Sequence, residues 1–366
     1  AFIPPLIVGN FGEWIQRALI FLVVSCPCAL VISVPLSFFG GIGGASKRGI
    51  LVKGSNYMET LSKIGTVVFD KTGTLTKGSF KVTAIHPEKS SEDELLDVAA
   101  AAESYSNHPI AESIIAAHKG HIDQSRIGEV KEHAGMGIEA VIDGRDIFAG
   151  NGKLMDMAGA KWHNCHIGGT VIHISEGSCY LGHIVISDEI KPDSKDAVKE
   201  LKNLGVEKTV MLTGDRKEIA ESVGKTLGLD EVHAELLPDG KVQAVEGLIE
   251  EGRPIAFVGD GINDAPVLAR ADLGVAMGAM GSDAAIEAAD LVLMDDKPSK
   301  LPEAIRIARK TMRIVWQNII FSLIVKAAVL ILAALGFANM WLAIFADVGV
   351  TVLAILNAMR AMRINK

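Results

Sequence analysis

The sequence predicts α-helical membrane segments joined to an α/β region, built as a doubly wound parallel sheet with an inserted α+β domain. Three observations lead to this fold class. Hydrophobic residues make up 49% and charged residues 22% of the 366 residues, and the mean hydropathy is +0.31. Long charge-free stretches lie near both ends, whereas the middle alternates short β-rich runs with helical stretches. A uniformly soluble protein is rarely so apolar and a pure membrane bundle rarely so charged, so the chain divides into membrane and water-exposed parts.

The charge balance and the cysteine content exclude several classes of protein. The 36 Lys and Arg residues against 44 Asp and Glu give a formal net charge of −8, whereas a nucleic-acid partner requires a basic face. The hydrophobicity excludes a disordered chain. Four cysteines are too few for a disulfide scaffold of this size. Cys26 and Cys28 lie one residue apart in an apolar run, so they could hardly join two distant segments.

The first membrane segment is predicted in residues 1–53. Residues 18–46 include no charged residue, and about 20 apolar residues suffice to cross a bilayer as a helix. Residues 1–8 resemble the end of another apolar span; they begin without Met and lack the basic start and cleavage site of a signal peptide. We therefore expect the chain to start inside a longer protein.

Two further membrane helices are predicted in residues 306–366. Between residues 314 and 359 only Lys326 and Asp347 carry charge, and a break is expected near residues 336–339. Basic residues flank this pair on one side, and the loops on the other side lack Lys and Arg. By the positive-inside rule the middle of the chain and its C-terminus are cytoplasmic, in a plasma or bacterial inner membrane. The alternative is a set of buried core helices.

Short apolar strands are predicted at residues 66–69, 209–212 and 255–258. Each ends in a polar, glycine-containing turn and is followed by a helical stretch, a repetition typical of a doubly wound parallel sheet. Within this region the pattern changes to helical and then alternating segments, which indicates an inserted domain. The predicted division is membrane segment 1–53, sheet domain 54–81 and 188–305, insert 82–187, and membrane helices 306–366.

The turns after the three strands each contain an aspartate and a glycine. They read Asp70-Lys71-Thr72-Gly73-Thr74, Thr213-Gly214-Asp215, and Gly259-Asp260-Gly261-Ile262-Asn263-Asp264. Ligands of such sheets bind at the carboxyl ends of the strands. A carboxylate there can attack phosphorus and form an acyl phosphate. The phosphoryl group needs hydroxyl and amide donors, a cation and Mg²⁺.

Each residue type in these turns suits a step of phosphoryl transfer. Asp70 is the candidate nucleophile, and Thr72, Thr213 and glycine amides can donate hydrogen bonds. Asp70, Thr72 and Asp260 are the candidate Mg²⁺ ligands, because Mg²⁺ prefers hard oxygen atoms. Lys241, at a predicted helix start, could reach a phosphate oxygen. The complete candidate catalytic set is Asp70, Lys71, Thr72, Thr213, Gly214, Asp215, Lys241, Asp260, Asn263 and Asp264.

Over essentially its whole length, the chain resembles the P-type ATPases, whose phosphorylation domain has the haloacid-dehalogenase-like fold. In that family the first Asp of Asp-Lys-Thr-Gly-Thr is phosphorylated by ATP, which implies this role for Asp70. Related soluble phosphatases carry a second Asp, two positions after the first, as general acid/base. This chain has Thr72 there, so nothing adjacent would activate water and the acyl phosphate should persist.

The insert holds a candidate nucleotide pocket. Two glycines separated by one residue let a backbone approach a phosphate or a ring closely, and a His beside Pro could stack on adenine. Neither signal is specific alone. In the heavy-metal branch of P-type ATPases, however, a Glu, a His-Pro pair, a Gly-x-Gly and a later Asn form the ATP pocket. The resemblance implies that these residues here are Glu103, His108, Gly135, Gly137 and Asn151.

Several histidines and cysteines also gather in the insert. They are His163, Cys165, His166, His173, Cys179 and His183. They lack zinc-finger spacing and fall in predicted strands, so we expect ordinary structural residues rather than a metal site.

A further candidate site lies in the membrane segments. Pro27 kinks its helix and frees a carbonyl, so that Cys26 and Cys28 face one point, and thiolates are soft metal ligands. The alternative is two inert thiols around a structural kink. Ionisable groups inside a membrane are usually functional. Asp347 would supply a hard oxygen and negative charge, and Lys326 would pair with Asp347 or a thiolate in the empty site. The alternative for these two is a structural salt bridge.

The resemblance assigns a cargo to this site. Cys-Pro-Cys before the phosphorylated Asp marks the heavy-metal pumps, and the zinc/cadmium/lead branch carries Lys and Asp in the two later helices. This implies that Cys26, Cys28, Lys326 and Asp347 handle transported Zn²⁺, Cd²⁺ or Pb²⁺, with ATP and Mg²⁺ as cofactors. The alternatives are a Cu⁺ pump, a membrane-anchored phosphatase, or a metal sensor without activity.

The family's actuator domain, with Thr-Gly-Glu, and its earlier membrane helices do not occur in this sequence. We expect them as partners within the same protein, beside the lipid bilayer. The present chain alone would therefore lack full turnover.

Overall fold

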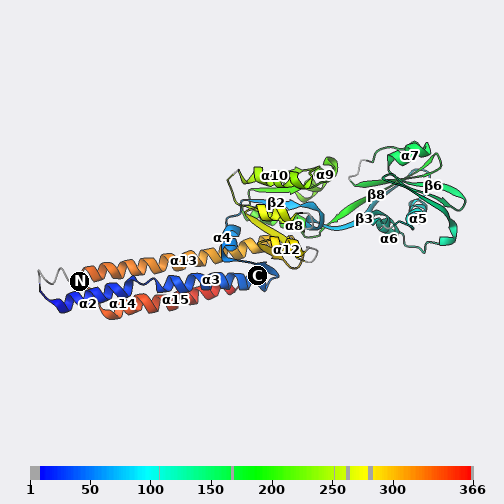
Figure 1. Ribbon diagram of the computed structural model, residues 1–366. Helices are drawn as coiled ribbons and strands as arrows, with labels where there is room; N and C mark the ends of the chain where they lie inside the picture. The colour runs from blue at the N-terminus through cyan, green and yellow to red at the C-terminus, as the bar shows by residue number, and fades with distance from the viewer. Residues whose placement is uncertain are drawn as a thin grey trace. The chain divides into compact units, whose positions relative to one another are not determined.

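The computed structural model describes residues 9–106, 108–165, 169–250, 252–260, 264–278 and 283–363. Contacts divide the chain into two units, whose elements are labelled in Figure 1. The first unit comprises Ala1–Asp70, Lys195–Val210 and Leu237–Lys366, and the second comprises Lys71–Ser194 and Met211–Leu236.

The apolar stretches at both ends of the chain form long helices of the first unit. Three stretches among the described residues are long and apolar enough to cross a membrane, namely Phe11–Ser46, Lys300–Ala334 and Met340–Met362. Large apolar side chains such as Leu22 (74% exposed) and Phe337 (78% exposed) face outward, which suits a lipid environment. The elements are α2 (Phe11–Ser25), α3 (Cys28–Ser46), α13 (Lys300–Ala334), α14 (Met340–Ile344), η3 (Phe345–Gly349), α15 (Val350–Ala358) and η4 (Met359–Met362).

Pro27 separates α2 from α3. A proline has no N–H to donate and clashes with the preceding turn, so the helix breaks there. The carbonyl oxygen of Pro27 accepts hydrogen bonds from the backbone N–H groups of Leu30 (2.9 Å) and Val31 (3.1 Å), which begin α3. The last carbonyls of α2 have no partner within their own helix and become available to other donors.

Small residues let α3 pack closely against its neighbours. A Cβ atom added to Gly41 would lie 2.3 Å from Oγ1 of Thr311 in α13, and one added to Gly40 would lie 3.2 Å from Cβ of Ala361 in η4. Backbones approach this closely where glycine or alanine lines a helix interface, which is common in membranes. Glycine at these two positions therefore lets α3 lie directly against α13 and η4.

A seven-stranded sheet begins in the first unit. Its strand order is β1-β13-β12-β11-β2-β9-β10. Strand β11 pairs in parallel with both β2 and β12, and β12 pairs in parallel with β13, whereas β1 is antiparallel to β13. The strands are β1 (Ile50–Val52), β2 (Thr66–Asp70), β9 (Lys208–Leu212), β10 (Glu231–His233), β11 (Ile255–Gly259), β12 (Leu273–Met277) and β13 (Leu291–Leu293).

The three strands expected from the sequence are therefore present, each within two residues of its predicted bounds. Every residue of β2 and of β11 is buried. Strands covered on both faces have continuous apolar runs, and this explains why the sequence pattern reveals them clearly. The accompanying helices are α4 (Ser55–Ser62), α8 (Ser194–Asn203), α9 (Lys217–Leu227), α10 (Pro238–Ile249), α11 (Ala265–Arg270) and α12 (Asp283–Ala288).

The second unit is built on a six-stranded antiparallel sheet with the order β3-β8-β7-β6-β5-β4. Its core packs Leu95, Ala99 and Ile114 of the helices with Ile174 and Ile184 of the strands. The strands are β3 (Thr76–Pro87), β4 (Ile127–His133), β5 (Gly137–Ile142), β6 (Arg145–Gly150), β7 (Thr170–Glu176) and β8 (Cys179–Ile190). The other elements are η1 (Lys71–Leu75), α5 (Glu92–Glu103), α6 (Pro109–Ala117), η2 (Gln124–Arg126) and α7 (Gly152–Ala158).

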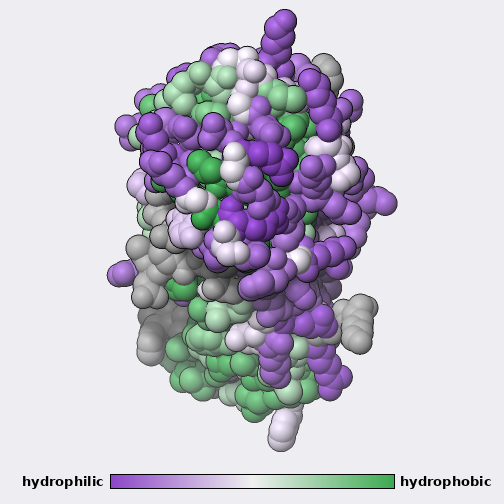
Figure 2. Space-filling view, turned by 90° about the vertical axis from the view of Figure 1, so that its right-hand side faces the viewer, coloured by the Kyte–Doolittle hydropathy of each residue, from purple (hydrophilic) through white to green (hydrophobic). Residues whose placement is uncertain are grey.

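The side of the molecule that lies at the right in Figure 1 faces the viewer in Figure 2. Hydrophilic residues predominate over the upper part of that face. Such a surface is typical of a domain in contact with water.

Candidate functional site

A buried cluster of charged side chains lies at the end of strand β2. Asp70, the last residue of β2, is 6% exposed, and Asp264, just before α11, is 2% exposed. Nζ of Lys241, in the first turn of α10, donates to Oδ1 of Asp70 at 2.6 Å and to Oδ1 of Asp264 at 2.8 Å. One ammonium group therefore joins two carboxylates that the sequence places far apart.

The local sequence explains how these groups meet. Pro238 begins α10, a position where proline's missing N–H costs nothing, and it places Lys241 in the first turn. Gly259 ends β11, and a Cβ atom there would lie 3.0 Å from Oδ2 of Asp264 and 3.0 Å from Phe257. Glycine thus leaves room for the Asp264 carboxylate next to the strand.

Burial and neighbouring charge shift the acidity of Asp70. Burial, followed by the carboxylates of Asp264 and Asp260, raises the pKa of Asp70 to about 7, and the ammonium of Lys241 opposes this rise. Burial disfavours the charged form of Lys241, but the two carboxylates outweigh it and raise the pKa of Lys241. Three carboxylates around one ammonium leave an excess of negative charge. Hard oxygen ligands with this charge fit a divalent ion such as Mg²⁺.

The turn after Asp70 is fixed by hydrogen bonds within the second unit. Nζ of Lys191 donates to the carbonyl oxygen of Gly73 at 2.7 Å, and Oγ1 of Thr76 donates to that of Lys71 at 2.9 Å. Gly73 has a φ of +71°, a conformation that glycine adopts without strain. Lys191 was not among the residues predicted from the sequence. Lys191 is buried. A buried ammonium group is costly unless it has hydrogen-bond acceptors, and the Gly73 carbonyl oxygen is one.

The turn after β9 supplies a partner for Lys71. Nζ of Lys71, a residue that is 7% exposed, donates to Oδ2 of Asp215 at 2.5 Å. The backbone N–H of Asp215 donates to Oγ1 of Thr213 at 3.1 Å, which stabilises the turn. A Cβ atom at Gly214 would lie 3.3 Å from the carbonyl oxygen of Leu236. Thr72 is exposed, and Asn263 lies outside the described residues.

In the second unit, the glycine pair and Asn151 lie together. Nδ2 of Asn151 donates to the carbonyl oxygen of Gly135 at 2.9 Å, and Oδ1 of Asn151 accepts from the N–H groups of Lys153 and Leu154. Asn151 therefore joins the glycine turn to the start of α7. Gly137 has a φ of +138°, and a Cβ atom there would lie 2.3 Å from the carbonyl oxygen of Ala149. Only glycine fits this position.

A pocket of about 430 Å³ lies in the same unit. Its lining residues are Tyr105, Ser106, Gly128, Val130, Glu132 and Ile138. Glu103 is 6% exposed, and burial, together with the charge of Glu132, raises the pKa of Glu103 to about 7. His108 lies at the surface as the N-cap of α6, where its Nδ1 accepts from the N–H of Ile110 at 3.2 Å. Tyr105 and Glu132 were not predicted, because an exposed aromatic or acidic residue carries no distinctive spacing.

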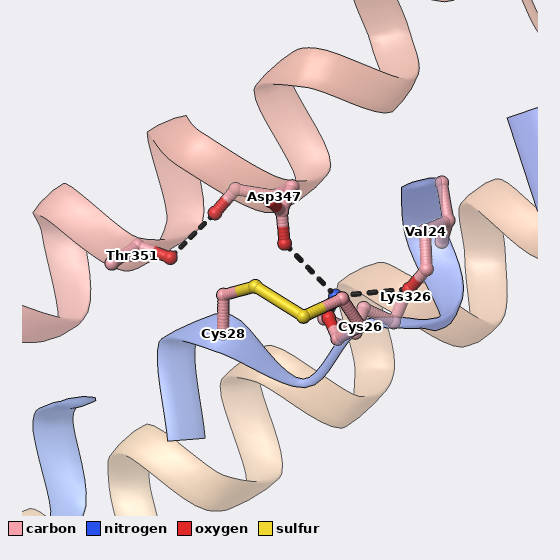
Figure 3. The surroundings of a disulfide bond; sticks show 6 residues. All are labelled: Val24, Cys26, Cys28, Lys326, Asp347 and Thr351. Atoms are coloured by element: carbon pink, nitrogen blue, oxygen red, sulfur yellow. Dashed lines mark hydrogen bonds and ion pairs between the residues drawn. A yellow bond between two sulfur atoms is a disulfide. The ribbon is translucent and has the colours of Figure 1, made fainter. Parts of the chain in front are cut away.

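The break between α2 and α3 forms a polar site among the membrane helices (Figure 3). Nζ of Lys326 donates to the carbonyl oxygen of Val24 at 2.9 Å and to that of Cys26, and it lies 3.4 Å from Oδ1 of Asp347. Asp347 belongs to the π-helical turn η3, and its carbonyl oxygen accepts from Oγ1 of Thr351 at 2.6 Å. The ammonium of Lys326 is thus held by the carbonyls that Pro27 frees.

The state of the two cysteines differs from the expected pair of thiols. Cys26 and Cys28 form a disulfide, with their Cα atoms 5.5 Å apart, beside Lys326 and Asp347 (Figure 3). The kink at Pro27 turns both sulfur atoms toward the same side, which allows them to bond. In this form neither sulfur carries the negative charge of a thiolate ligand, so metal binding by these residues requires reduction of the disulfide.

The comparisons with known proteins agree with this geometry. Residues 64–272 match the family described as "Hydrolase: haloacid dehalogenase-like hydrolase". The chain belongs to the haloacid dehalogenase-like hydrolase family. The predicted haloacid-dehalogenase-like fold is therefore confirmed.

Curated proteins similar to this chain are named as metal-transporting ATPases. It is 57% identical over 370 residues to the cadmium, zinc and cobalt-transporting ATPase of Bacillus subtilis, covering 100% of this chain and 53% of the relative. It is 53% identical over 365 residues to the zinc-transporting ATPase of Synechocystis, covering 98% and 51%. The chain thus spans about half the length of the curated relatives it matches.

A solved structure extends the similarity to the membrane helices. The crystal structure of a zinc-transporting PIB-type ATPase in the E2.Pi state matches with a TM-score of 0.88 and 38% identity, over 99% of this chain and 60% of that chain. The resemblance to heavy-metal-transporting P-type ATPases is confirmed, as is the prediction of an integral membrane protein with cytoplasmic catalytic domains.

The raised pKa of Asp70 yields a prediction for stability. The pKa is about 7 in the folded chain against an ordinary 3.8, so ionisation of Asp70 opposes folding as pH rises between these values. Asp70→Asn should therefore become more stable than the natural chain over this range, by roughly 1–4 kcal/mol above neutrality. Thermal unfolding of both chains at about pH 5 and about pH 8 measures the difference. Asp239→Asn, an exposed change in α10, is the control and should alter little. A less stable Asp70→Asn chain at the higher pH would contradict the assignment.

Proposed function

We propose that the chain forms the catalytic and ion-binding part of a pump that exports Zn²⁺, Cd²⁺ or Pb²⁺ across a membrane. ATP drives the export through a mixed anhydride of phosphate and an aspartyl side chain, that is, an acyl phosphate on Asp70. The observation that carries this proposal is the buried Asp70, Lys241 and Asp264 cluster at the end of β2. A carboxylate held at the carboxyl end of a parallel strand by a lysine is arranged to attack a phosphorus atom.

The chemistry follows from the groups in this cluster. A carboxylate oxygen of Asp70 bonds to the γ-phosphorus of ATP while the bond from that phosphorus to the bridging oxygen breaks, and ADP leaves with the electron pair. Lys241 holds Asp70 in its ionised form and neutralises charge on the transferred group. Asp70, Thr72 and Asp260 would hold Mg²⁺, which supplies further charge neutralisation when bound. Lys71, Thr213, Gly214, Asp215 and Asn263 complete the proposed catalytic set.

ATP is bound by the insert, residues 82–187, in this proposal. Glu103, His108, Gly135, Gly137 and Asn151 form the nucleotide site. The backbone at Gly137 leaves no space for a side chain, which favours close approach of a ligand to the main chain. Tyr105, 60% exposed at the edge of the pocket, offers an aromatic face for the adenine ring.

The transported ion is bound where the membrane helices meet. After reduction, Cys26 and Cys28 supply thiolates, and Asp347 supplies a carboxylate whose charge helps to balance a divalent ion. Lys326 neutralises Asp347 when no ion is bound, a role that the 3.4 Å ion pair supports. The incoming ion displaces Lys326 through charge repulsion. The similarity to ATPases named for zinc, cadmium and cobalt favours a divalent cargo over Cu⁺.

The proposal extends to the organisation of the whole pump. Membrane segments 1–53 and 306–366 form part of the ion path, and 54–81 with 188–305 form the phosphorylation domain. Turnover also needs an actuator domain and further membrane helices of the same protein, because the relatives are about twice as long as this chain. A membrane-anchored phosphatase is disfavoured, because Thr72 replaces the acid/base carboxylate.

Phosphate transfer from ATP tests the proposed function. With Mg²⁺ and ATP labelled in the γ-phosphate, the full-length protein should become labelled, and Asp70→Asn should lose the label at least about 100-fold because the nucleophile is gone. Asp239→Asn, an exposed change in the same domain, should keep it. Equal labelling of Asp70→Asn and the natural protein would rule the proposal out.

The metal dependence of the reaction tests the cargo. In the presence of a reductant that frees Cys26 and Cys28, Zn²⁺, Cd²⁺ or Pb²⁺ should stimulate ATP hydrolysis by the full-length protein. Asp347→Asn removes the charge that balances a divalent ion and should lower this stimulation at least about tenfold. Glu303→Gln, outside the proposed ion site, serves as the control. Full stimulation of Asp347→Asn by Cu⁺ alone would favour the copper alternative.

A further inference from the structure

A cluster of histidines and a cysteine lies in the second unit, and none of its members is among the proposed catalytic residues. His86 in β3 and His183 in β8 are directly opposite each other in the antiparallel pairing, with ring centroids 4.9 Å apart. Cys165 comes from the segment between α7 and β7. One possible ligand atom from each of His86, Cys165 and His183 lies within 4.8 Å of the other two.

The cluster contains buried nitrogen atoms that lack hydrogen-bond partners. Among the described residues, Nε2 of His183 and Nε2 of His86 are buried without one, and His183 is only 3% exposed. Buried polar atoms in folded proteins are almost always hydrogen-bonded, to protein or to water. Two such nitrogen atoms in one cluster with a thiol therefore point to a bound ligand.

Neighbouring groups orient the His183 ring as metal-binding histidines require. Oη of Tyr180 lies 3.1 Å from Nδ1 of His183 and 2.7 Å from Nδ1 of His173. If Tyr180 donates to His173, its oxygen accepts the Nδ1–H of His183. This leaves Nε2 of His183 with a free lone pair, the tautomer in which imidazole binds a metal through Nε2.

We propose that His86, His183 and Cys165 bind a divalent ion of the Zn²⁺, Cd²⁺ or Co²⁺ class. Two imidazoles and one thiolate are the ligands these ions prefer, whereas Mg²⁺ and Ca²⁺ prefer oxygen. Binding converts the Cys165 thiol to a thiolate and releases its proton to solvent. Three protein ligands leave the fourth position of a tetrahedral ion to water. This site is separate from the membrane site and does not depend on the proposed export.

Metal binding at this site would fix the segment that follows α7. Trp162, in the same segment as Cys165, packs on His173 with ring centroids 4.9 Å apart and donates from Nε1 to Asp156 at 2.9 Å. A Cβ atom at Gly152, the first residue of α7, would lie 2.3 Å from the Trp162 ring. An ion that joins Cys165 to β3 and β8 therefore restrains a segment lying on α7, whose N-cap is Asn151.

Co²⁺ titration of the full chain tests the site. Cys26→Ser with Cys28→Ser removes the membrane thiols, so any remaining sulfur ligand lies in the second unit. We expect about one equivalent of Co²⁺ to give a sulfur-to-cobalt charge-transfer band in the near ultraviolet and the strong visible bands of four-coordinate Co²⁺, with Zn²⁺ displacing it. Addition of Zn²⁺ alone should change the fluorescence of Trp162, since the other tryptophans, Trp14, Trp316 and Trp341, lie in the membrane helices.

Matched variants separate a metal site from a structural cluster. In the same background, Cys165→Ser should abolish the charge-transfer band, and His86→Gln or His183→Gln should weaken Co²⁺ binding at least about tenfold. Cys179→Ser changes the other cysteine of this unit and should leave the band unchanged. Circular dichroism checks that each variant folds. If His183→Gln does not fold, His86→Gln provides the test, because His86 is only partly buried. Absence of the band in the background chain, or its persistence in Cys165→Ser, would overturn the proposal.

Discussion

The ammonium group of Lys241 lies between the buried carboxylates of Asp70 and Asp264, and the proposed catalytic site depends on this interaction. Two carboxylates in a site of low dielectric cannot both ionise without a nearby cation. Lys241 supplies that cation at 2.6 Å and 2.8 Å, so that Asp70 can ionise near neutral pH, as its proposed role of nucleophile requires. The buried parallel strands β2 and β11 position Asp70 and Asp264, which lie at or after their carboxyl ends. Helix α10 positions Lys241.

In the membrane site, too, a buried lysine is paired with a carboxylate. Lys326 is buried among helices and is held by carbonyl oxygens of Val24 and Cys26 and by Asp347. Each site thus keeps a lysine where charge is costly, and each lysine is paired with a carboxylate. In the proposed function, Lys241 supplies a cation to the incoming phosphoryl group, whereas the incoming metal ion takes the place of the Lys326 ammonium beside Asp347. This contrast explains why a lysine suits both places in the proposed pump.

Local patterns made much of this structure predictable from the sequence. Strands β2, β9 and β11 were predicted because continuous apolar runs end in glycine-containing turns, and parallel strands deliver those turns to one edge. That His86 lies opposite His183 was not predictable. The pairing depends on the register of β3 and β8, and this register shifts at irregularities along the two strands. Lys191 and Tyr105 were missed because a lone lysine or tyrosine has no spacing that marks its partner. The disulfide of Cys26 and Cys28 depends on side-chain directions set by the kink at Pro27.

The chemical identity of the phosphorylated residue decides whether Asp70 is the nucleophile. The full-length protein is incubated with ATP and Mg²⁺, quenched in acid and reduced with borohydride, which converts an aspartyl phosphate to homoserine. If Asp70 is the nucleophile, homoserine is expected at position 70, in the peptide that contains the end of β2, and in no other peptide. Phosphate retained on a serine or threonine, or homoserine at position 264 in place of position 70, would contradict it.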